Sequence, residues 1–193
     1  FSFYISYVLG GNDSDRQVVL FYYFLFAILG VPFWTYISKK IGKKKTWVSS
    51  LILSALFFIF VFFLSEGDIK FFIIISCITG FCLGADLIIP PSIQADVSDI
   101  HLNKFKEDIS GILFSLITFF NKLSFALASL FVFTILGFLN FEANEEINLE
   151  NKFFIIYSYA LIPIVLKFFS SFILMSFKIT EKDLKKVQKK IYG

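Results

Sequence analysis

Three charged side chains lie inside long apolar stretches of this sequence, and they are its strongest candidates for chemistry. Asp86, Lys122 and Lys167 are each the one charged residue of their stretch. A charge at the centre of a bilayer costs about 2.5–3.5 kcal/mol even on a lenient insertion scale, so such residues usually face a bundle interior or a wet cavity. We interpret Asp86 and Lys122 as candidate functional groups and Lys167 as an interior, structural residue.

The positions of Asp86 and Lys122 along their stretches suggest that the two side chains approach each other. Lys122 lies about eleven residues into 111–139, roughly 16 Å along a helix, and Asp86 lies about 10 Å before Ile93. Consecutive spans run antiparallel, so a long lysine side chain can bridge them. We predict that they form an internal charge pair or that Asp86 exchanges protons. The alternative is a polar contact that serves helix packing alone.

Polar residues follow the Asp86 stretch directly. Gln94, Asp96 and Asp99 stand at its end, and the two acids are three residues apart, which puts them on one face if the helix continues. One interpretation is that they pair with basic loop residues or with another part of the protein, and that this pairing closes a gate on the inner side of the membrane. The other is that they are solvated acids at a helix end.

The remaining reactive residues do not form a recognisable catalytic or metal site. Cys77 and Cys82 are five residues apart and have no nearby histidine or cysteine partner, so we predict no metal site. His101 is the single histidine and sits in a segment of mixed charge, which argues against a proton relay. The sequence offers no nucleophile–base array and no phosphate-binding glycine loop. We therefore expect neither an enzyme nor, since the basic loops adjoin apolar spans, a nucleic-acid-binding protein.

The composition indicates an all-α integral membrane protein. Hydrophobic residues make up 57% of the 193 residues, and 29 of them are Phe. Soluble domains contain about 45–50% apolar residues, and a spanning helix needs about 20 in a row. The predicted spans are residues 1–9, 17–38, 46–64, 71–93, 111–139 and 153–177. Because Phe1 stands inside an apolar run, we expect the first span to be truncated and an N-terminal portion to precede it.

Lysine distribution predicts how these spans are oriented. The lysine-poor side carries Arg16, Lys70 and Lys152. The other side holds Lys39, Lys40, Lys43, Lys44, Lys45, Lys104, Lys106 and the lysines of the basic tail 178–193. Loops rich in Lys and Arg stay in the cytoplasm, so we expect the lysine-rich side and the C-terminus to be cytoplasmic. Gly42, between two lysine groups, predicts a tight turn there.

Three blocks resemble the major facilitator superfamily, and within it the glycoside–pentoside–hexuronide:cation symporters, the melibiose-permease-like branch. The first is GVPFWTYISKKIGKKKTW at 30–47, similar to the motif between transmembrane helices eight and nine. The second is GADLIIPPSIQADVSD at 84–99, in helix ten. The third is SGILFSLITFFNKLSFALA at 110–128, in helix eleven, with Lys122 on the helix-eleven lysine of the family.

The resemblance implies the C-terminal six-helix half of a twelve-helix transporter, helices seven to twelve. Substrate then binds near the midplane between two halves that rock to expose it on either side. In that fold we expect Lys122, Asp86, Asn121 and Leu87 to line the cavity. Gln94, Asp96, Asp99, Gly42 and Lys43 are the expected cytoplasmic gating residues. This half is expected to bind no cofactor, and the coupling Na⁺ or H⁺ belongs to the N-terminal half.

We therefore expect a fragment of a secondary active transporter that carries a sugar or related small solute by cation symport. Alternatives are a transporter of the same fold for a lipid-like or drug-like solute, and a non-transporting membrane subunit or split-gene remnant. The expected partners are a small-molecule substrate, the lipid bilayer and the N-terminal six-helix half. The expected location is a bacterial cytoplasmic (inner) membrane.

Overall fold

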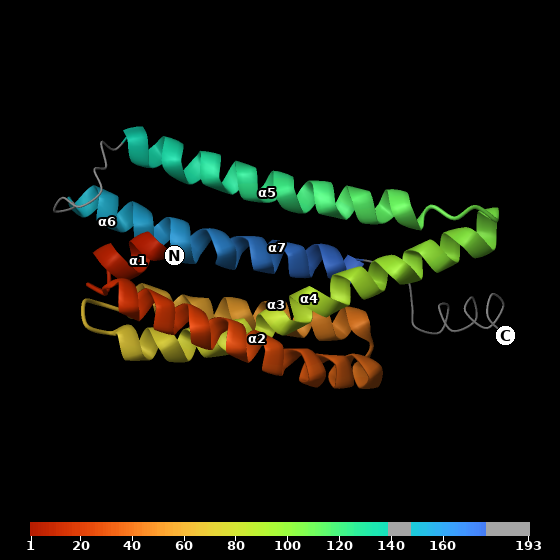
Figure 1. The fold of residues 1–193 in the computed structure, drawn as a ribbon, viewed down its shortest axis with the longest axis horizontal. Coiled ribbons are helices and arrows are strands. Elements are labelled where there is room, and N and C mark those ends of the chain that lie inside the picture. The colour runs from red at the N-terminus through yellow and green to blue at the C-terminus, as the bar shows by residue number, and fades with distance from the viewer. Residues whose placement is uncertain (139–147, 177–193) are drawn as a thin grey trace.

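The computed structural model describes residues 1–138 and 148–176, and within them every regular element is a helix (Figure 1). The basic tail 178–193 lies outside the described residues. The helices are α1 (Ser2–Tyr7), α2 (Asp13–Ile41), α3 (Lys43–Ile59), α4 (Ile69–Phe105), α5 (Ser110–Phe138), α6 (Leu149–Ile156) and α7 (Ile162–Ser176). A 3-10 turn, η1 (Phe60–Phe63), extends α3, and a π-helical turn, η2 (Tyr157–Leu161), joins α6 to α7.

Five of these helical segments are long and apolar enough to cross a membrane. They are Asp13–Ile41, Lys43–Phe63, Ile69–Phe105, Ser110–Phe138 and Leu149–Ser176. The segment predicted at residues 1–9 forms the short helix α1, which ends at Tyr7. The prediction of an all-α, multi-pass membrane protein is confirmed.

Helices α2 and α4 pack closely because glycines line their contact. A methyl group added at Gly84 of α4 would lie only 2.7 Å from the Ala27 carbonyl oxygen of α2. A methyl group added at Gly30 or Gly80 would lie at least as close to backbone atoms of the opposing helix. Small residues let helix backbones approach in membranes, where helices associate through packing rather than through the hydrophobic effect. The indole N–H of Trp34 adds a hydrogen bond across the same contact, 2.7 Å to the Phe81 carbonyl.

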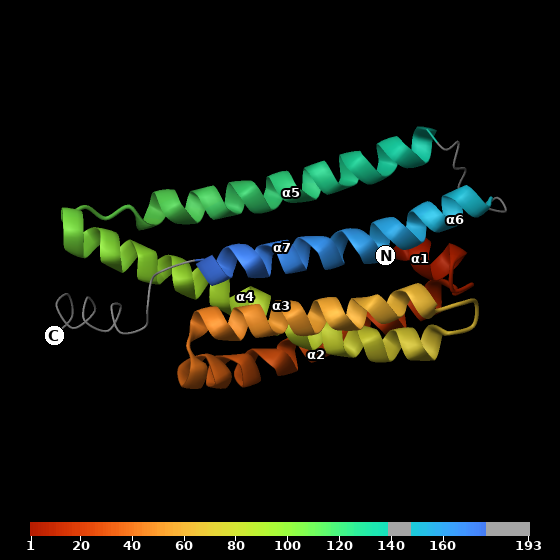
Figure 2. The ribbon, with the colours of Figure 1, turned by 180° about the vertical axis from the view of Figure 1, so that it is seen from behind.

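The predicted span 71–93 is too short, because helix α4 covers Ile69–Phe105. Helix α4 continues to Phe105 and ends where Lys106, in a left-handed conformation, donates its N–H to Leu102. Prolines at 90 and 91 remove hydrogen-bond donors and bend a helix without always ending it. The bend in α4 between its yellow-green and green parts is plain in Figure 2.

Helix α5 makes few contacts with the rest of the described chain. Leu136 is its one buried residue among those described. Figures 1 and 2 show α7 between α5 and the group formed by α2, α3 and α4. The side chains of α5 are therefore left for lipid or for other parts of the protein.

Candidate functional site

A one-residue turn at Gly42 places the first turn of α3 against α4. Gly42 has φ 90° and ψ 151°, a conformation open in practice to glycine, which confirms the predicted tight turn. The ammonium of Lys43 lies 2.5 Å from Oδ2 of Asp96 and donates to the Ser92 carbonyl at 3.3 Å. The side chain of Asp96 is only 6% exposed. The structure thus brings together Gly42, Lys43 and Asp96, three of the five predicted gating residues.

The other two predicted gating residues, Gln94 and Asp99, lie on the same stretch of α4. Gln94 is 7% exposed, and neither its amide oxygen nor its amide nitrogen has a hydrogen-bond partner in the part of the chain that the structure describes. Asp99 is half-buried. A buried amide without hydrogen-bond partners costs about 1–3 kcal/mol, so we expect water or a further polar group beside Gln94.

The next lysine of α3 reaches a different helix. Lys44 donates to the Met175 carbonyl at 2.8 Å, at the last turn of α7. A cation beside the carbonyls that end a helix is favoured by the helix dipole. The first turn of α3 therefore joins α4 through Lys43 and α7 through Lys44.

Deeper in the membrane, Asp86 joins the same three helices. Its Oδ1 accepts a hydrogen bond of 2.8 Å from the indole N–H of Trp47 on α3, and its Oδ2 lies 3.8 Å from the Lys167 ammonium on α7. We call Trp47, Asp86 and Lys167 the membrane triad. Its members come from three helices of one chain and bring one acid and one base together.

The predicted pair between Asp86 and Lys122 is wrong. The basic partner of Asp86 is Lys167, because α7 packs against α3 beside Asp86, whereas α5 lies on the outer side of α7 (Figure 1). Lys122 and its neighbour Asn121 are exposed on α5. Leu87 is 57% exposed on α4. Their expected role in lining a cavity stays a prediction.

Sequence reasoning misses two members of the membrane triad. From the sequence, Trp47 is not singled out, and Lys167 is interpreted as a structural residue. A signal is present, since the indole N–H of a sheltered tryptophan usually finds an acceptor and Asp86 is the one carboxylate within its span. The spacing does not show whether Asp86 pairs with Lys122 or with Lys167, because the two lysines lie on different helices.

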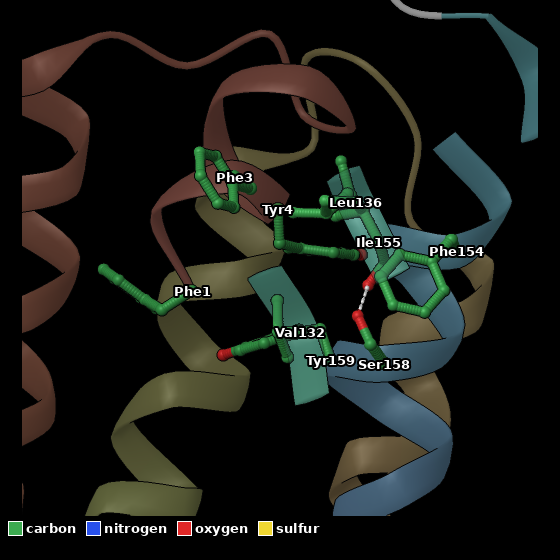
Figure 3. A pocket seen from close by; sticks show the side chains of 9 residues that line it. All are labelled: Phe1, Phe3, Tyr4, Val132, Leu136, Phe154, Ile155, Ser158 and Tyr159. Atoms are coloured by element: carbon green, nitrogen blue, oxygen red, sulfur yellow. Dashed lines mark hydrogen bonds between the residues drawn. The ribbon is translucent and has the colours of Figure 1, made fainter. Parts of the chain in front are cut away.

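A small apolar cavity of about 110 Å³ lies at the other end of the molecule, beside α1 (Figure 3). It is lined by Phe1, Phe3, Tyr4, Val132, Leu136, Phe154, Ile155, Ser158 and Tyr159. The rings of Tyr4 and Tyr159 stack at 4.8 Å, and the Tyr4 hydroxyl donates to the Val61 carbonyl at 2.7 Å. Because its lining is mostly apolar and the hydroxyls of Tyr4 and Ser158 both donate to backbone carbonyls, we assign it to packing.

Residues 1–138 and 148–176 contain no group of three or more His, Cys, Asp or Glu side chains that could hold a metal ion. The charged groups of the candidate site are instead arranged as acid–base pairs. Such pairs can exchange partners or protons when the helices that carry them move. The site is therefore suited to conformational coupling.

The chain matches known transport proteins over almost its whole length. The model of the family described as MFS/sugar transport protein matches residues 1–181. The sodium-dependent lysophosphatidylcholine symporter 1 of Xenopus tropicalis is 28% identical over 198 aligned residues, which cover 98% of this chain and 36% of the relative. The chain thus spans little more than a third of that relative's length. It belongs to the MFS/sugar transport family, among membrane transporters of the major facilitator superfamily.

Proposed function

We propose that the chain is part of a cation-coupled symporter that moves a small solute by alternating access. The observation that carries this is Lys122, which is exposed about 18 Å along the apolar helix α5. An ammonium at that depth is unfavourable in lipid and is normally sheltered by a water-filled cavity or a carboxylate. A solute pathway beside α5 provides that shelter, with Asn121, Leu87 and Asp86 as further lining groups.

The remaining wall of that pathway belongs to a second set of helices. We propose that this chain is the C-terminal six-helix half of a melibiose-permease-like transporter, paired with an N-terminal half that carries the coupling-cation site. Support comes from the exposed apolar faces of α2, with Phe21, Phe24 and Ile28, and of α5, with Phe119 and Phe125. Two six-helix halves related by an axis along the membrane normal would cover such faces.

The lysine-rich end is proposed to be the cytoplasmic gate. Gly42 and the Lys43–Asp96 pair stand where α2, α3 and α4 meet, with Gln94 and Asp99 close by along α4. Lysine-rich loops favour the cytoplasm, which supports a cytoplasmic position for this end and for the C-terminus. A bacterial cytoplasmic membrane stays a prediction, since the symporter with which the chain aligns comes from Xenopus tropicalis.

Two solute classes follow from the comparisons. The family description names sugar transport, whereas the name of the Xenopus relative specifies a lysophospholipid. A sugar is the first candidate because the three sequence blocks resemble sugar:cation symporters. A lysophospholipid is the second, supported by the relative's name.

Uptake by the full-length protein in proteoliposomes tests both candidates. Radiolabelled melibiose and lysophosphatidylcholine are offered separately with an inward Na⁺ gradient, an inward H⁺ gradient or neither. Symport requires that one solute accumulates and that dissipating one cation gradient abolishes the accumulation. A non-transporting subunit or remnant would give no uptake above empty vesicles under any condition, and that result would refute the proposal.

A further inference from the structure

The two acid–base pairs of this chain differ in how tightly they are closed. Lys43 and Asp96 are 2.5 Å apart, and their side chains are 26% and 6% exposed. Asp86 and Lys167 are 3.8 Å apart, and their side chains are 28% and 22% exposed. The first pair is a short hydrogen bond to a buried carboxylate, whereas the second is near the outer limit of an ion pair and its carboxylate is partly exposed.

The open pair is also the deeper one. Asp86 precedes Asp96 on α4 by about 15 Å of helix, and Lys167 precedes the end of α7 at Ser176 by about 14 Å. Both residues lie inside segments long and apolar enough to span a membrane. Because lipid solvates neither charge, the exposed part of the pair requires water or a polar group of the full-length protein beside it. Water that reaches the pair can deliver a proton.

The two oxygens of Asp86 have different partners. Oδ1 accepts from the Trp47 indole, a donor that carries no charge and does not titrate in this range. Oδ2 faces Lys167 at a distance that leaves room for a proton on the oxygen. The indole therefore holds the carboxyl group in place whether or not Oδ2 is protonated.

The charged and titratable groups around Asp86 come from all the packed helices. Lys167 faces it from α7, Tyr23 from α2, and Cys82 from the preceding turn of α4, each within electrostatic reach. On α3 the contact is Trp47. Lys167 is the cation of this set, so the ionised pair carries no net charge.

We propose that Asp86 is a proton-binding site within the membrane-spanning part of this chain, with Lys167 as the cation that competes with the proton. In the step, the ionised Asp86 takes a proton from water onto Oδ2. Lys167 keeps its own protons and loses its anionic partner, so the site gains one positive charge. The link between α4 and α7 is thereby weakened. Its use in transport rests on the proposed function, but the protonation itself does not.

Infrared difference spectroscopy of the full-length protein in lipid vesicles tests this site. A protonated carboxylic acid has a C=O stretching band that is absent from a carboxylate. As the pH is lowered, the wild type should gain this band, and D86N should lose its Asp86 component. In K167M the midpoint of the band should rise by one pH unit or more, because a nearby cation favours the charged form of an acid. W47F should keep the band, and D108N, at an exposed aspartate outside the site, serves as the control that also keeps it.

A band that D86N leaves unchanged, or a midpoint that K167M does not move, would overturn the proposal. If D86N does not fold, D86E and K167M replace it in the test. D86E retains a carboxylic acid at position 86, and K167M retains Asp86 without its cationic partner. Solute uptake is measured in the same vesicles. No uptake together with a normal Asp86 titration rejects the proposed transport function alone. Uptake without any Asp86 titration rejects the proton site alone.

Discussion

The ammonium of Lys43, the first residue of α3, lies 2.5 Å from the carboxylate of Asp96 within α4. The contact exists because Gly42 reverses the chain in one residue and because α4 continues as a helix past its two prolines. Either a longer loop after α2 or an earlier end of α4 would separate the two charges. The Lys43–Asp96 pair therefore depends both on the turn at Gly42 and on the continuation of α4.

Replacing Lys43 with Met should destabilise the protein by about 3 kcal/mol, because it takes the cation away from a carboxylate that is almost fully sheltered. The measurement is thermal unfolding in detergent micelles. K45M is the matched control, since Lys45 is exposed at the same turn. The double variant K43M/D96N should recover part of the loss. Equal shifts for K43M and K45M would contradict the role of the pair.

Replacing Gly84 with Ala should force α2 and α4 apart, since the new methyl group would stand 2.7 Å from the Ala27 carbonyl oxygen. Overpacking of this kind typically costs about 1–3 kcal/mol. The control is G137A, because a methyl group at Gly137 of α5 meets no atom within 4 Å. Helix propensity alone should make G137A neutral or stabilising. Thermal unfolding that is the same for both variants would argue against close packing of α2 and α4.

Replacing Gly42 with Ala should weaken the turn between α2 and α3. The φ of 90° with ψ of 151° is strained for any residue with a Cβ, at a cost of about 1–3 kcal/mol. A lowered melting temperature is expected, together with reduced protection of the nearby backbone amides in hydrogen exchange. G111A, at a glycine with open space around it, is the comparison and should show neither effect.

Replacing Lys122 with Met should reduce solute uptake at least tenfold and leave thermal stability nearly unchanged. The reason is that Lys122 is exposed on α5, so its removal should disturb the proposed solute pathway rather than packing. K122R should retain part of the uptake. S115A, an exposed position of the same helix, should retain all of it. A large loss of stability in K122M with normal uptake per folded molecule would assign Lys122 a structural role.

Much of the fold was predictable because the length of an apolar run and the charge of a loop are set by residues that are neighbours in the sequence. Long apolar runs separated by polar turns predicted the helices, and Gly42 predicted the turn that the structure shows. The extension of α4 to Phe105 was not predicted, because polar residues from 94 onward are also typical of a loop. The ion pair of Asp96 with Lys43 of α3 stabilises a helix where composition alone suggested none.

The sequence by itself determined that this chain spans a membrane and that an acid and two lysines lie within its apolar helices. Those statements follow from residue type and run length, which need no knowledge of which helices are neighbours. Tertiary structure decided that Asp86 pairs with Lys167 and Trp47 and not with Lys122. The physical reason is that charge pairing depends on distances of a few ångströms between helices, and these are set by packing among α3, α4 and α7 and by the position of α5 beyond them.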